Sequence, residues 1–166
     1  MDDSDINKEF SRNPTLDDLV ELCKHLNEIN AEYVVIGGFA LIHYGFIRGT
    51  ADIDLLVNNS EENISKIRKA LLYLPDKAAK ELSLTDIKEY HVVRIADEIV
   101  IDLLEKACGV SFEDAKKHIV YETIKNIPIP YLDVELLIQT KQSIRPKDVI
   151  DRQYLEQLLN SLKKKS

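Results

Sequence analysis

The chain has 166 residues, 45% of them hydrophobic, which suits one globular domain that buries about 70% of its unfolded surface and leaves no room for a second. The net charge of -7 and a pI near 5.1 disfavour broad binding to a nucleic-acid backbone, although a local basic patch would still hold a nucleotide or an RNA end. No apolar run reaches the roughly 20 residues of a membrane helix, and the opening residues MDDSDINKEF lack the pattern of a secretory signal, so we expect a cytoplasmic protein.

The predicted elements alternate between helix and strand. In chain order they are a helix over residues 15–29, a strand over 33–36, a short helix over 39–44, a strand over 52–57, a helix over 60–74, a weakly helical segment over 76–89, strands over 90–95 and 98–104, a short helix over 111–117, extended segments over 119–123 and 127–131, and helices over 133–141 and 146–162. We therefore expect an α/β (α+β) fold, with a small mixed β-sheet flanked by helices.

Three local patterns make sharper predictions. Residues 96–97, between two β-rich runs, predict a hairpin with a two-residue turn. Pro128 and Pro130 lack the backbone donor that a central strand needs, so their segment is expected at the edge of the sheet. Cys23 and Cys108 have no C-x-x-C spacing, which favours two buried free thiols over a zinc site or a disulfide.

Aspartates interrupt two of the apolar strands. The period-two geometry of a strand places Asp52 and Asp54 on one face. Like charges so close repel each other, so the pair is unfavourable unless a cation or a hydrogen-bond network compensates, and Mg²⁺ is the cation that all-oxygen ligands favour. Asp102 would complete a carboxylate cluster for two metal ions. Exposed acids at a strand end are the alternative.

A glycine pair precedes the short second helix. Gly37 and Gly38 lie after a strand and before a helix, where bare backbone lets a phosphate approach and the helix N-terminal N–H groups can hold it. A tight turn that needs positive φ is the alternative.

These motifs together resemble a known signature. Gly37-Gly38, thirteen intervening residues and then Asp52-Ile53-Asp54-Leu55 are similar to the signature of the DNA polymerase beta-like nucleotidyltransferase superfamily. The resemblance is strongest to the minimal bacterial and archaeal branch that includes AbiEii toxin-like proteins and antibiotic nucleotidyltransferases. The further matching residues are Phe39, Ala40, Gly45, Arg48, Thr50, Lys141, Arg145-Pro146-Lys147-Asp148 and Asp151. The resemblance covers about residues 30–160.

The resemblance implies a nucleotidyltransferase that uses two Mg²⁺ ions, or Mn²⁺, to move a nucleoside monophosphate from an NTP such as ATP to a hydroxyl on tRNA, a protein or a small molecule such as an aminoglycoside. It implies that the metal ligands are Asp52, Asp54 and Asp102, with Asp102 also the general base. The implied nucleotide-binding residues are Gly37, Gly38, Arg48, Thr50 and Lys141. Alternatively, Arg48 fixes its own loop and Lys141 faces a helix end. Asp148 and Asp151 are expected to be first-turn acids of the last helix.

The domain implied by the resemblance spans residues 1–166, with a core over about 30–160 after the N-terminal helix. Phe39 stands where many members of the superfamily carry a small or hydroxyl residue, and the chain is too short for a second domain that shapes an acceptor pocket. We therefore expect a partner subunit, a second copy in a homodimer, or the acceptor itself to complete the site. The alternative function is a non-catalytic nucleotide-binding or toxin-antitoxin interaction protein. Its expected mark, the loss of one carboxylate, is absent from this sequence, and an Asp102 that points away from Asp52 and Asp54 would revive it.

Overall fold

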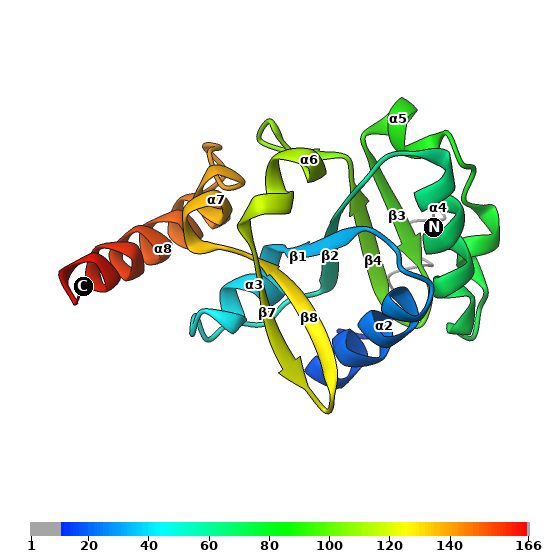
Figure 1. The fold of residues 1–166 in the computed structure, drawn as a ribbon, viewed down its shortest axis with the longest axis horizontal. Helices are drawn as coiled ribbons and strands as arrows, with labels where there is room; N and C mark the ends of the chain where they lie inside the picture. Colours follow the sequence, from blue (N-terminus) through cyan, green and yellow to red (C-terminus); the bar gives the residue numbers. More distant parts are fainter. Residues whose placement is uncertain (1–10, 166) are drawn as a thin grey trace.

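The computed structural model describes residues 11–165. Six strands form one mixed sheet in the order β3-β4-β2-β1-β8-β7 (Figure 1). Their bounds are Tyr33–Ile36 for β1, Asp52–Val57 for β2, Val92–Ala96 for β3, Val100–Leu104 for β4, Ile119–Ile124 for β7 and Ile127–Leu132 for β8. Parallel pairing joins β2 to β4 and β1 to β8, and the other neighbours are antiparallel. A separate short hairpin consists of β5 (Lys106–Ala107) and β6 (Val110–Ser111).

Helices flank this sheet. They are α2 (Leu16–Glu28), α3 (Gly37–His43), α4 (Glu61–Ala70), α5 (Asp86–Tyr90), α6 (Phe112–Ala115), α7 (Val134–Gln139) and α8 (Pro146–Lys164), with 3-10 turns η1 (Leu71–Tyr73), η2 (Ala78–Glu81) and η3 (Lys116–His118). Helices α2 and α4 pack against each other, while α7 and α8 lie at the other end of the molecule (Figure 1). Among residues 11–165, no helix is both long enough and apolar enough to cross a membrane.

The first helix shows how the sequence specifies its own ends. Thr15 accepts a hydrogen bond from the backbone N–H of Asp18, whose carboxylate accepts one from the backbone N–H of Thr15 at 2.7 Å. This capping box satisfies two N–H groups that a helix leaves unpaired. Leu19, Leu22 and Leu26, at helical spacing, are fully buried in the core. The helix predicted over 15–29 is therefore confirmed.

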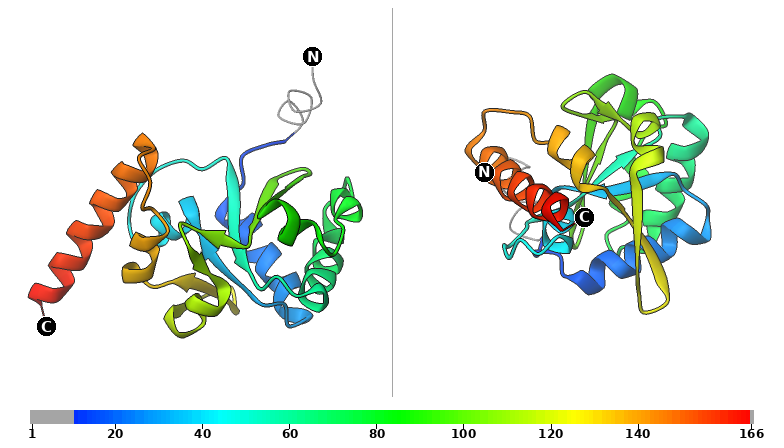
Figure 2. Two further views of the ribbon diagram at one scale, coloured as in Figure 1. Left: turned by 90° about the horizontal axis from the view of Figure 1, so that it is seen from above. Right: turned by 60° about the vertical axis from the view of Figure 1, so that its left-hand side comes forward.

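Helix α8 extends away from the body of the molecule (Figure 2). Its buried residues are Asp148, Asp151 and Leu155, all in its N-terminal half, and residues 160–165 are exposed. Tyr154, Leu158 and Leu159 are partly buried against the core, so α8 contacts the body of the molecule up to about residue 159.

The predicted hairpin turn at residues 96–97 is wrong by one position, and its first strand begins later than predicted. The turn lies at 97–99, with the backbone N–H of Asp97 donating to the carbonyl of Ile99 at 3.1 Å. The buried Asp97 carboxylate accepts backbone hydrogen bonds from Asp76, Ala78 and Glu98, so it fixes the turn to a segment distant in sequence. His91, with φ +67°, ends α5 and delays the strand to residue 92.

The predicted edge position of the proline-containing strand is also wrong, because β8 lies between β1 and β7. The carbonyl of Pro128 accepts from the Asn27 side chain at 2.9 Å, so this side of Pro128 faces away from β7. The N and carbonyl of one strand residue share a side, and Pro130 repeats that orientation two residues later. Pairing with β1 is confined to Val35 and Tyr131. The missing N–H groups of the two prolines therefore lie on the side of β8 that forms few backbone hydrogen bonds with its neighbour.

Cys23 is buried as expected, whereas the prediction that Cys108 is buried is wrong. Cys108 has φ +47° and precedes Gly109 with φ +82°, and together they form the turn between β5 and β6. A two-residue hairpin turn that needs positive φ at both positions explains the pair. This places the Cys108 thiol at the surface.

Candidate active site

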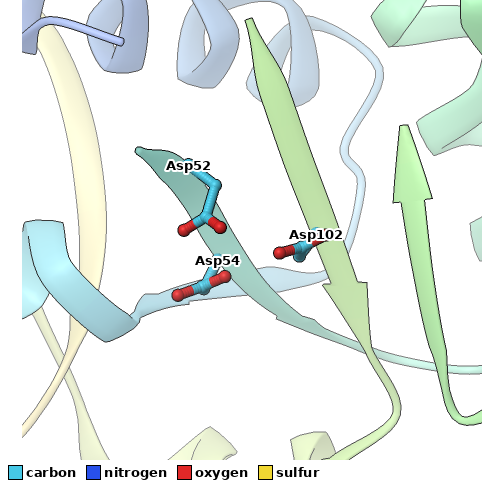
Figure 3. A group of neighbouring side chains, drawn as sticks. All are labelled: Asp52, Asp54 and Asp102. Atoms are coloured by element: carbon cyan, nitrogen blue, oxygen red, sulfur yellow. The ribbon is translucent and has the colours of Figure 1, made fainter. Parts of the chain in front are cut away.

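The three aspartates lie together on β2 and β4 (Figure 3). These strands pair in parallel with Asp54 directly opposite Asp102, and in-register neighbours present their side chains on the same face of a sheet. Asp52 lies two residues earlier on that face, while the intervening Ile53 is fully buried in the core. Oxygens from the three carboxylates all lie within 4.8 Å of one another.

Proximity and burial make this cluster electrostatically unfavourable by itself. Burial, followed by the charges of Asp52 and Asp102, raises the pKa of Asp54 to about 7. Burial and the neighbouring Asp102 also raise the pKa of Asp52. In the part of the chain that the structure describes, Asp54 receives no hydrogen bond from another side chain. The cluster therefore favours the arrival of a cation.

One arginine from the neighbouring strand contacts the cluster. Arg94 on β3 is paired in register with Asp102 on β4. Its Nε and Nη2 donate to the two oxygens of Asp102 at 2.9 and 3.0 Å, and Nη2 also donates to Asp52 at 3.2 Å. These contacts raise the pKa of Arg94 above its ordinary value. The sequence analysis missed this residue.

The glycine pair has a structural role in positioning the cluster. Gly37 has φ +67°, and a Cβ there would lie 2.0 Å from the carboxylate Oδ2 of Asp54. A Cβ on Gly38 would lie 2.5 Å from Oγ1 of Thr50, which donates to the carbonyl of Asp52 at 2.9 Å. Both glycines are thus required for the close approach of α3 to β2. The positive φ that the turn alternative expected is present at Gly37.

The opposite side of the site carries a second group of charges, from the segment before β2, from the connection between α7 and α8, and from the start of α8. Arg48 Nη1 donates to the buried carboxylate of Asp151. Lys141 Nζ lies 3.0 Å from Oδ2 of Asp151, an electrostatic contact without hydrogen-bond geometry, and 3.5 Å from Oδ1 of Asp148. Arg145, largely exposed, donates to Asp148 at 3.2 and 3.4 Å. Asp148 is a first-turn acid of α8 as predicted, whereas Asp151 lies beyond the first turn, and both are buried ion-pair partners.

A cleft of about 570 Å³ separates the two charged groups. Its lining includes the predicted site residues Gly37, Gly38, Arg48, Thr50, Asp52, Asp54, Asp102 and Lys141. Further lining residues are Arg94, Cys108, Arg145 and Lys147. Lys147 is exposed and forms no ion pair with any described residue. The cleft therefore has an acidic wall on β2 and β4 and a basic wall at the start of α8.

Comparisons with known proteins add a relationship of fold. No protein-family model matches the chain, and no curated protein matches it. A crystal structure of a "putative nucleotidyltransferase" from Thermotoga maritima is similar, with a TM-score of 0.55 and 20% identical residues over 88% of this chain and 92% of that one. The chain therefore shares the fold of that protein.

The mixed sheet flanked by helices, shared with that structure, confirms the predicted fold class. Within this fold, the residues chosen from sequence lie around one cleft. Arg94 and Lys147 also line it and had no assigned role. A basic residue in a β-rich run was the available signal for Arg94, but its contact with Asp102 depends on the pairing of β3 with β4. Phe39 is buried in the core, so its bulk does not fill the cleft.

Proposed function

We propose that this protein is a Mg²⁺-dependent nucleotidyltransferase that moves a nucleoside monophosphate from an NTP to a hydroxyl acceptor. The observation that carries the proposal is one cleft in which three clustered carboxylates face a group of cations. An acidic wall attracts divalent metal, and a basic wall attracts phosphate oxygens. A magnesium nucleotide presents both kinds of charge. The nucleotidyltransferase fold of the chain supports this reading.

The residues present fit a site for hard divalent cations. Asp52, Asp54 and Asp102 supply oxygen ligands only, and their oxygens are close enough together to share an ion. Burial and, after it, the charges of Asp52 and Asp102 hold the pKa of Asp54 near 7, and bound cations would offset both effects. We propose that these three side chains hold Mg²⁺, two ions in the complete site, with Mn²⁺ as a substitute. Bound Mg²⁺ would stabilise charge on the phosphate oxygens and on departing pyrophosphate.

The basic wall is proposed to hold the triphosphate. Arg48 and Lys141 line the cleft while their charges are balanced in part by Asp151, so they provide a fixed positive surface. Lys147 brings a further charge with no ion-pair partner among residues 11–165. Gly37-Gly38 and Thr50 border the same space and are proposed to bring bare backbone and a hydroxyl close to the nucleotide.

The chemical step needs a base next to the acceptor. The acceptor hydroxyl oxygen attacks the α-phosphorus, the bond from that phosphorus to the pyrophosphate oxygen breaks, and the hydroxyl proton passes to Asp102. Asp102 is nearly buried and faces Asp52 and Asp54. All three carboxylates are present and Asp102 does not point away from the other two, and these observations support the enzyme over the non-catalytic alternative.

The acceptor is proposed to be a tRNA, a protein or a small molecule such as an aminoglycoside, and a second subunit or the acceptor itself would complete the open side of the cleft. Label transfer from each α-³²P-labelled NTP with Mg²⁺, to the protein, to total RNA and to a cell extract, tests the proposal. We expect labelling by the wild type that disappears in Asp52→Asn/Asp54→Asn. Absence of labelling with every acceptor, despite binding of Mg²⁺ and NTP, would contradict catalysis and favour the nucleotide-binding or toxin-antitoxin alternative.

A further inference from the structure

Arg94 is the one residue in the acidic wall that carries a positive charge among those that the structure describes. It binds both oxygens of Asp102 and one oxygen of Asp52. Two parallel bonds from a guanidinium to a carboxylate form a strong, geometrically specific ion pair. The arginine therefore holds two of the three proposed metal ligands in position.

The arginine uses oxygens that a metal ion would also need. A divalent ion shared by Asp52 and Asp102 takes carboxylate oxygens as ligands, and both oxygens of Asp102 accept from Arg94. A guanidinium and a metal ion at the same oxygens also repel each other. Because each carboxylate oxygen has a second lone pair, the conflict is one of charge, and the positive charge of Arg94 disfavours metal binding.

The surroundings of Arg94 allow it to leave. Strand β3 is at the edge of the sheet, and the Arg94 side chain is 54% exposed. Neighbouring residues on β3, Val92 and Val93, are exposed or partly buried. Release of the guanidinium into the cleft or to solvent thus requires a change of side-chain rotamer and no rearrangement of the core.

We propose that Arg94 is an internal counter-cation that holds Asp52 and Asp102 together in the metal-free protein and is displaced when metal binds. The inference rests on the proposed function, because it assigns the metal to these carboxylates. It makes Arg94 a positioning residue that sets the metal concentration at which the site fills. Removing its charge should strengthen metal binding and weaken the metal-free fold.

The test is titration of Mn²⁺ into the whole chain, by electron paramagnetic resonance of free Mn²⁺, for the wild type and Arg94→Gln. Arg12→Gln is a matched control, since Arg12 also makes two bonds to one carboxylate, Asp18, and one to another, Glu98, but lies outside the cleft lining. We expect Arg94→Gln to bind Mn²⁺ about tenfold more tightly. Arg12→Gln should match the wild type.

A second readout keeps the test independent of activity. Saturating Mn²⁺ should raise the melting temperature of Arg94→Gln more than that of the wild type, because the variant begins with an uncompensated acidic cluster. Arg94→Lys, which keeps the charge without the paired bonds, should give intermediate affinity. Equal or weaker Mn²⁺ binding by a folded Arg94→Gln would overturn the role of Arg94 alone. Mn²⁺ binding that survives Asp52→Asn/Asp54→Asn unchanged would overturn the metal site and this inference together.

Discussion

Both walls of the cleft combine aspartates with basic side chains, but basic side chains are in excess on one wall and aspartates on the other. On the wall at the start of α8, Asp148 and Asp151 are surrounded by three cations, and both acids are buried. On the wall formed by β2 and β4, one half-exposed arginine pairs with two of the three acids, Asp52 and Asp102. Buried acids that are paired with cations link parts of the fold. Acids that outnumber their cations repel one another and favour the binding of a further cation.

This difference also separates acids that fold the protein from acids proposed to act. Arg48 and Asp151 join the segment before β2 to α8, and they are 103 positions apart in the sequence. Asp54 lines the cleft but makes no comparable ion pair between distant segments. Loss of a buried acid from the basic wall should therefore lower stability, whereas loss of Asp54 should lower nucleotidyl transfer without lowering stability.

The largest effect is expected from Asp54→Asn, which removes a charge from the acidic wall. Nucleotidyl transfer should fall about 10³-fold or more, because groups that stabilise the transition-state charge are worth that much, while the metal-free protein should be no less stable. Transfer of α-³²P label and thermal unfolding measure the two properties. Asp17→Asn, the same change at an exposed ion pair with Lys125, is the control. Full activity in Asp54→Asn would place the chemistry elsewhere.

Asp151→Asn should have its effect on stability. The substitution leaves Arg48 and Lys141 without the buried charge that they contact, and breaking a buried pair costs about 3 kcal/mol of unfolding free energy. Denaturant unfolding measures the loss, and Asp17→Asn should change stability by less than about 0.5 kcal/mol. If Asp151→Asn loses as little unfolding free energy as the control, the ion pairs of the basic wall do not stabilise the fold.

The acidic wall should also make the stability of the protein depend on pH, through Asp54. Because the pKa of Asp54 is raised to about 7 in the folded chain, the folded state holds this proton more tightly than the unfolded state, in which the carboxyl titrates near 4. This group therefore costs stability increasingly as pH rises from about 4 to 7, and costs nothing below that range. In EDTA, Asp54→Asn should gain about 2 kcal/mol over the wild type across the interval, discounted for partial exposure. A difference that is constant with pH would contradict the electrostatic strain.

The smallest effect is expected at Lys147, which adds charge to the basic wall without an ion pair among the described residues. Lys147→Ala should weaken NTP binding about fivefold, since an exposed charge contributes about 1 kcal/mol, and leave stability unchanged. Isothermal titration with Mg²⁺ present measures the affinity. Lys80→Ala, at an exposed lysine outside the cleft lining, should bind NTP as the wild type does; equal affinity in both variants would remove Lys147 from the nucleotide site.

The acidic wall was more predictable from sequence than its partner arginine. Asp52 and Asp54 are visible because they break an apolar strand with period two, and local periodicity needs no knowledge of the fold. The capping box at Thr15 is equally local. Arg94 reaches Asp102 because β3 is paired in register with β4, and a single sequence does not fix register beyond a turn that was itself misplaced by one residue.

The basic wall illustrates the same limit over longer separations. Arg48 and Lys141 were chosen through the resemblance, but their contacts with Asp151 depend on where α8 packs. Cys108 was expected inside because cysteine is commonly buried, and a hairpin turn placed it at the cleft. Local patterns thus predicted elements and acids, while packing between distant elements decided which charges meet.

The measurement that tests the central claim most directly is the rate of Cys108 alkylation by a maleimide in the presence and absence of Mg²⁺ and each NTP. Cys108 is exposed and lines the cleft, whereas Cys23 is fully buried and serves as an internal standard for unfolding. A magnesium nucleotide held between the two walls should slow modification of Cys108 more than Mg²⁺ or NTP alone, and Asp52→Asn/Asp54→Asn should lose the effect of Mg²⁺. Unchanged alkylation of Cys108 at concentrations that saturate NTP binding would contradict the placement of the nucleotide in this cleft.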